Sequence, residues 1–142
     1  MTSAARACIK AIFWGSVTGG GPFLILTLPL GISLSASGEL AMALAFAFLP
    51  LIISGTVVIG AFVLLGLPLT AFLANEGDEK ATTYATAGAG LGAILPFAFG
   101  MSQGNMIAGL VLAVPGGLAG LVTGSIWGRW REARRTFREV FN

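Results

Sequence analysis

The residue types that most often carry catalysis or metal binding are scarce in this sequence. It contains no histidine, and Cys8 is its only cysteine. Haem or metal sites with histidine ligands, a Ser-His-Asp triad, and a CxxC pair or disulfide within the chain are therefore excluded. The one cluster of carboxylates, at Glu76, Asp78 and Glu79, lacks the spacing of a calcium-binding loop. We predict a protein that is not an enzyme and that binds no metal or cofactor.

Charged residues are absent from three long stretches of the chain. Only 10% of the residues are charged whereas 56% are hydrophobic, and residues 11–38, 40–75 and 81–128 contain no Asp, Glu, Lys or Arg. Soluble domains carry about a quarter charged residues, so this composition predicts a membrane protein. Charged groups inside a membrane usually mark proton relays and ion pathways, and their absence argues against a proton-coupled transporter.

The apolar stretches divide into four predicted transmembrane helices. About 20 apolar residues cross a bilayer as a helix, and we predict spans over residues 11–34, 44–70, 82–101 and 106–128. Short polar turns and one acidic segment separate them. The predicted fold is a single all-α membrane domain over residues 1–142, built from two helical hairpins.

Glycine and proline predict that the first and second spans are irregular. The first contains Gly-Gly-Gly-Pro at residues 19–22, which favours a kink. The apolar run 40–73 would be about 50 Å long as a straight helix, which is too long for one upright span and too short for two. We expect breaks at Pro50 and Pro68. The pattern leaves open whether this run is one bent span or a span plus an interfacial or re-entrant helix.

The basic residues predict that both termini are cytoplasmic. With four spans, one side of the membrane receives all of them, namely Arg6, Lys10, Lys80, Arg129, Arg131, Arg134, Arg135 and Arg138. The turns at 35–39 and 102–105 on the other side contain neither Lys nor Arg, and cytoplasmic loops are the ones enriched in these residues. High alanine and glycine content, with more arginine than lysine, favours a bacterial inner membrane.

Small residues recur every fourth position in three of the spans, which is the pattern of helices that pack closely in membranes. The predicted helix-packing residues are Gly15 and Gly19 in the first span, Gly88 and Gly92 in the third, and Gly116, Gly120, Gly124 and Gly128 in the fourth. The main interpretation is that these glycine zippers hold the four helices of the chain together. The alternative is that one stripe faces another protein, and Gly15 with Gly19 is the better candidate for that external contact.

In the tail, residues 127–142, aromatic and basic side chains occupy different faces at helical spacing. This pattern predicts an amphipathic helix in the cytoplasmic membrane interface, bound to anionic lipid head groups. Its membrane-interface residues are Trp127, Arg129, Trp130, Arg131, Arg134, Arg135, Phe137, Arg138 and Phe141. Docking on a partner subunit is the alternative, and nucleic-acid binding is disfavoured because no recognition motif accompanies the charge. The acidic loop 76–79 is expected to be solvated, with Arg134 or Arg135 as a possible ion-pair partner.

These features favour a non-catalytic inner-membrane protein that acts as an accessory or assembly subunit, or as a helix-packing scaffold, of a larger membrane complex. A membrane-protein partner or a homo-oligomer is expected. The first alternative is a homo-oligomeric small channel or holin-like pore, although uniformly apolar spans argue against a wide aqueous lumen. The second is a membrane protein that binds a lipid or apolar metabolite against its kinked second span.

Overall fold

The computed structural model describes residues 3–76 and 79–141, with side chains described for 3–75 and 79–137. Every element in these ranges is helical. In chain order they are α1 (Ser3–Ala36), α2 (Leu40–Ala61), a π-helical turn η1 (Phe62–Gly66), α3 (Leu67–Glu76), α4 (Ala81–Ser102) and α5 (Met106–Phe141). Because η1 joins α2 to α3 without a gap, the described chain forms four long helical rods.

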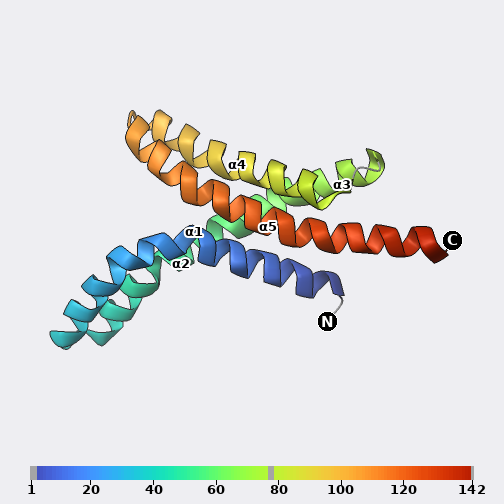
Figure 1. Cartoon of the computed structure of the whole chain (residues 1–142). Coiled ribbons are helices and arrows are strands. Elements are labelled where there is room, and N and C mark those ends of the chain that lie inside the picture. The colour runs from blue at the N-terminus through green and yellow to red at the C-terminus, as the bar shows by residue number, and fades with distance from the viewer. Residues whose placement is uncertain (1–2, 77–78, 142) are drawn as a thin grey trace.

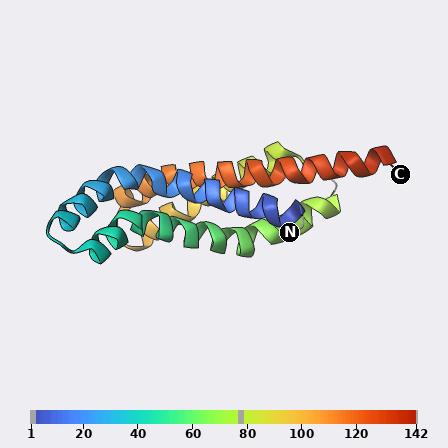
Figure 2. The same ribbon diagram turned by 90° about the horizontal axis from the view of Figure 1, so that it is seen from below.

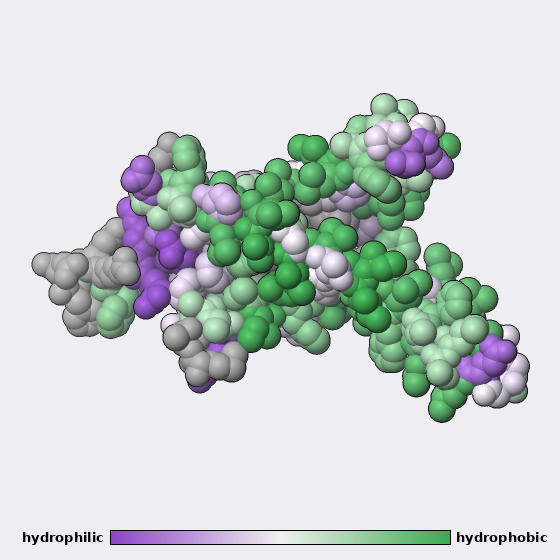
Figure 3. All heavy atoms as spheres, turned by 180° about the vertical axis from the view of Figure 1, so that it is seen from behind, coloured by the Kyte–Doolittle hydropathy of each residue, from purple (hydrophilic) through white to green (hydrophobic). Residues whose placement is uncertain are grey.

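All four rods are long and apolar enough to cross a membrane. They cover Ser3–Ala36, Leu40–Asn75, Ala81–Ser102 and Met106–Phe137. The prediction of an all-helical chain with four membrane-length helices is therefore confirmed. Space-filling Figure 3 shows the same division on the surface, with apolar residues along the rods and polar residues gathered at their ends.

The rods form two antiparallel hairpins, α1 with α2 and α4 with α5, joined by contact between α1 and α5 (Figure 1). The two hairpins diverge toward their turns, so the molecule is forked. Figure 1 shows the rods crossing near the middle of the molecule. Both termini lie on the other side of this crossing from the fork, and we call that side the converging end (Figures 1 and 2). This shape differs from an evenly packed four-helix bundle, in which all four helices would stay in contact along their length.

The α4–α5 hairpin depends on glycine at several facing positions. A Cβ atom added at Gly88 would collide with the carbonyl oxygen of Gly120, and one added at Gly92 would collide with that of Gly116. Near the turn, Gly104 adopts φ +69°, which suits glycine. The Asn105 side chain then accepts a hydrogen bond of 2.9 Å from the backbone N–H of Ala108 and so caps α5. The tight turn predicted at 102–105 is therefore present.

The prolines bend the helices less than the sequence suggests. Pro50 lies inside α2 without breaking it, contrary to expectation. The irregularity instead falls at η1, just before Pro68, where the backbone N–H of Leu67 bonds to the carbonyl oxygen of Phe62 five residues back. Proline has no N–H to donate, and a wider turn is a common response to such a defect. In α1 the helix is continuous but changes direction near its middle (Figure 1), where residues 19–22 lie.

The fourth rod does not end at residue 128. Helix α5 continues without interruption from Met106 to Phe141, about 54 Å at 1.5 Å per residue. Residues 129–141 are helical as predicted, but they form no helix of their own, because the basic segment is the straight continuation of the span (Figure 2). The cause lies in contacts that fix the first turns beyond Gly128, described below.

The α4–α5 interface yields a prediction about Gly92. The substitution Gly92→Ala should cost about 1–3 kcal/mol of unfolding free energy, because the new methyl group meets the Gly116 carbonyl and pushes the helices apart. Gly90→Ala on the same helix is the matched control, since its Cβ meets nothing within 4 Å. It should be neutral or stabilising by up to about 1 kcal/mol through helix propensity. Loss of helicity during SDS titration measures both, and equal effects would contradict the packing described.

Candidate functional site

The most buried part of the protein is a cluster around Trp127 at the converging end of the rods. Its buried members come from all four rods: Ala11, Phe62, Leu73, Tyr84 and Trp127. Ala7, Cys8, Ile12, Leu69, Ile126 and Trp130 pack around them. We call this group the Trp127 core. It is the one place in the described structure where α1, η1 with α3, α4 and α5 all contribute to the same cluster.

Trp127 is held in this core by ring contacts and a hydrogen bond. Its ring meets the ring of Phe62 edge-on, with centroids 5.2 Å apart, and lies 4.9 Å from the ring of Trp130. Its Nε1–H donates to the hydroxyl of Thr70 over 3.0 Å, and that hydroxyl donates to the carbonyl oxygen of Gly66 over 2.7 Å. The polar atom of a buried indole needs such a partner. Thr70 therefore ties α5 to the rod that contains the π-helical turn.

Tyr84 brings one unpaired polar atom into the same core. The residue is only 3% exposed, and its hydroxyl has no hydrogen-bond partner among the described residues. Its carbonyl group meets α5 directly, because a Cβ added at Gly124 would collide with the Tyr84 oxygen. A buried hydroxyl without a partner costs free energy, so the ring of Tyr84 must contribute packing that offsets this cost.

Two polar contacts fix the start of α4 to the segment of α5 beyond the apolar run. The guanidinium of Arg131 forms an ion pair with the carboxylate of Glu79. The carboxylate of Glu132 accepts a hydrogen bond of 3.2 Å from the backbone N–H of Ala81, the first residue of α4. A carboxylate there satisfies one of the open N–H groups and interacts well with the helix dipole. These contacts hold the basic segment beside the 79–81 loop and keep it in line with α5.

The ion pair also corrects the partner expected for the acidic loop. The loop was expected to be solvated, with Arg134 or Arg135 as the alternative ion-pair partner, but Glu79 pairs with Arg131. The side chains of Glu76 and Asp78 lie outside the described residues. The Glu79–Arg131 pair is half-buried and positions the loop beside α5.

The predicted interface residues occupy several different environments. Trp127 is only 8% exposed, so its assignment as a lipid-facing residue is wrong. Arg129 is exposed, Trp130 and Arg135 are half-buried, and Phe137 is 65% exposed. The Arg134 guanidinium lies over the Trp130 ring, 5.2 Å from its centroid. The side chains of Arg138 and Phe141 lie outside the described part of the chain.

The glycine pair of the first span faces inward. A Cβ at Gly15 would collide with the Thr123 hydroxyl, and one at Gly19 would lie 3.1 Å from the Cβ of Ala119. The expectation that Gly15 and Gly19 are the better candidates for an external contact is therefore wrong, because α5 covers Gly15, and α5 together with Ser54 of α2 covers Gly19. Gly116, Gly120 and Gly124 face α4, and Gly128 meets Ala81 and Tyr84 at its start.

No metal site is formed by the described residues, since no three His, Cys, Asp or Glu side chains come together. The Trp127 core itself was not predicted from the sequence. Trp127 and Thr70 are 57 residues apart, and neither the periodicity nor the composition links them. The one clue in the sequence is that Trp127 lies between Gly124 and Gly128 of the stripe that packs against α4.

Comparison of this chain with protein-family models, with curated proteins and with solved structures finds no match. Its function must therefore be argued from its own residues.

The hydrogen bond between Trp127 and Thr70 can be tested with a double-mutant cycle. Trp127→Phe and Thr70→Val each remove one partner, and the cycle should give a coupling free energy of about 1 kcal/mol. Thr86→Val in place of Thr70→Val is the control, because Thr86 bonds only to the backbone of its own helix. SDS titration gives the unfolding free energies of the wild type, the two single variants and the double variant. Strict additivity of the Trp127 and Thr70 effects would contradict the contact.

Proposed function

We propose that this protein is a non-catalytic, multi-pass protein of the bacterial inner membrane that serves as an accessory or assembly subunit, or as a helix-packing scaffold, of a larger membrane complex. The observation that carries the proposal is the fork. Two rigid hairpins are joined at one end and present apolar walls at the other, which is a geometry suited to receiving helices of a partner.

The arms of the fork are covered with exposed apolar side chains. Between 6% and 17% of the residues in the most apolar windows of the four rods are buried. Large side chains at the arms are open, with Ile25 75% exposed on α1 and Ile107 76% exposed on α5. Gly21 and Gly90 likewise face open space. Lipid alone can cover such walls, but small residues among them allow close approach of another helix, which lipid does not require.

The hydroxyl groups inside the arms form hydrogen bonds within the chain, which supports a non-catalytic role. Thr18, Thr56 and Thr86 each donate to the carbonyl oxygen four residues back in their own helix. Ser54 donates to the carbonyl oxygen of Ser16 across the first hairpin, over 3.1 Å. Hydroxyls bonded in this way stabilise helices and their packing, and we find no base beside a nucleophile among them.

The distribution of charge supports a cytoplasmic location for both termini. Arg6 and Lys10 on α1, Lys80 before α4 and the arginines of α5 belong to the converging end, whereas the turn at 37–39 carries only Glu39 as a charged residue. In a C8A background, a membrane-impermeant maleimide should label Ser37→Cys in intact cells and should label Thr136→Cys only after permeabilisation. The reverse pattern would refute this orientation.

Purification from native membranes in mild detergent tests the accessory role. A photo-crosslinking residue placed at the exposed Ile107 should give one discrete protein adduct, in near-stoichiometric yield, with a protein that also co-purifies. The same probe at the buried Phe62 is the control and should give none. A lone monomer, with no protein adduct at the arms, would contradict the proposal. Adducts only between copies of this chain would point to a homo-oligomer, including a small channel, in place of a larger complex.

A further inference from the structure

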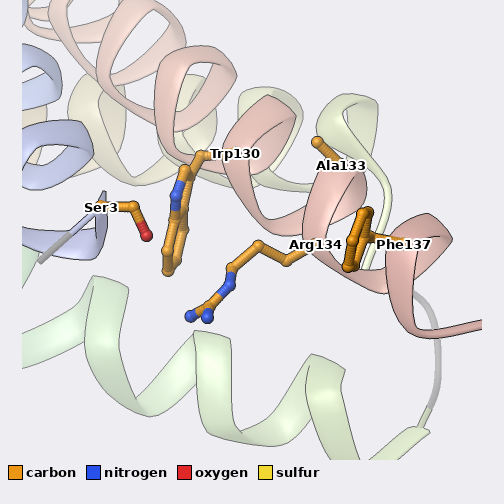
Figure 4. A pocket seen from close by; sticks show the side chains of 5 residues that line it. All are labelled: Ser3, Trp130, Ala133, Arg134 and Phe137. Atoms are coloured by element: carbon orange, nitrogen blue, oxygen red, sulfur yellow. The ribbon is translucent and has the colours of Figure 1, made fainter. Parts of the chain in front are cut away.

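A shallow groove lies between the start of α1 and the last turns of α5. It has a volume of about 330 Å³ and is lined by Ser3, Trp130, Ala133, Arg134 and Phe137. Figure 4 shows the Arg134 side chain extending from α5 between the rings of Trp130 and Phe137, with its guanidinium toward Trp130 and Ser3. The groove therefore holds one cationic group between two aromatic rings.

Nearby acids do not neutralise this arginine in the described structure. Arg134 is exposed, and none of the groove residues is acidic. The described carboxylates of α5 and of the adjoining loop bond to other groups. Glu132 accepts from the backbone N–H of Ala81, and Glu79 pairs with Arg131. The first residue of α1, Ser3, also lines the groove, so the positive end of a helix dipole faces the same space. Both features favour an anion in the groove.

The depth of the groove matches the lipid head groups. The uncharged part of α5, from Met106 to Gly128, is about 34 Å long at 1.5 Å per residue, close to the thickness of a bilayer core of about 30 Å. Arg134 is six residues further along the same straight helix, about 9 Å beyond Gly128. Trp130 lies between them, at the level where amphipathic rings of membrane proteins gather.

We propose that this groove binds the phosphate of an anionic phospholipid head group. The Arg134 guanidinium donates N–H groups to phosphate oxygens, which its planar shape suits better than a lysine ammonium would. The Trp130 ring fixes the guanidinium from one side by a cation–π contact. The Ser3 hydroxyl supplies a second donor, and Phe137 lines the side of the groove that lies further from the acyl chains. The inference rests on the proposed membrane location and does not depend on the accessory role.

Lipid retention by the full-length protein tests the site. Native mass spectrometry of protein titrated with phosphatidylglycerol in detergent should show binding that Arg134→Ala weakens by about tenfold, the factor expected for one charge-assisted hydrogen-bonded contact. Arg129→Ala is the matched control, since it removes an exposed arginine of the same helix outside the groove. It should change binding by less than about twofold. Equal losses in the two variants would show diffuse attraction to the surface and would overturn the proposal.

Two further measurements test the geometry of the site and the source of the bound phosphate. Arg134→Lys keeps the charge but loses the two-pronged donor, so binding should fall by about threefold, between wild type and Arg134→Ala. Phosphatidylcholine of the same chain length should be retained much less than phosphatidylglycerol. Displacement of the lipid by millimolar inorganic phosphate would instead identify a free-anion site and would contradict the lipid assignment. Partner co-purification should survive Arg134→Ala, so failure of the lipid site and failure of the accessory role are distinguishable.

Discussion

The close approach of α1 to α5 is the constraint on which the arrangement of the whole chain depends. Gly15 and Gly19 allow α1 to lie against Thr123 and Ala119 of α5, where any side chain would collide or crowd. The Thr123 hydroxyl lies 3.4 Å from the carbonyl oxygen of Ala11 as well as bonding within its own helix. Because α1 and α5 make most of the contacts between the two hairpins in the described structure, this crossing sets the angle of the fork. In a membrane, where lipid is as apolar as the helices, such close packing replaces the hydrophobic effect as the source of association.

The buried core lies beside this crossing. Helices that meet at an angle separate beyond their crossing, and on the side of the termini rings from η1, α4 and α5 fill the space between them. The rings of Trp127, Phe62 and Tyr84 form the core on this side. Next to it, Arg131 and Glu132 of α5 bind the 79–81 loop through Glu79 and Ala81. The result is a protein with a fixed, basic end and two separated apolar arms. In the proposed roles, the basic end binds lipid head groups and the arms bind partner helices.

Features that depend on local sequence could be predicted, and features that depend on distant contacts could not. The four apolar helices and the turn at 102–105 follow from hydropathy and turn residues. Pro50 was expected to break its helix, but a single missing hydrogen bond is tolerated inside a long apolar helix. The aromatic and basic pattern after Gly128 is helical as expected, but its direction follows from Arg131 and Glu132 reaching the 79–81 loop. Likewise, the burial of Trp127 follows from Thr70 and Phe62, which no spacing rule relates to it.

The most direct test of this account is the separation of the two hairpin turns in a lipid bilayer. Spin labels at Ser37→Cys and Gln103→Cys, in a C8A background and in nanodiscs, report it by double electron–electron resonance. The forked structure predicts a long distance, well beyond the roughly 8–10 Å between axes of packed helices, because the turns lie at the tips of separate arms (Figure 1). A short distance with strong dipolar broadening would show a closed bundle and would contradict the fork.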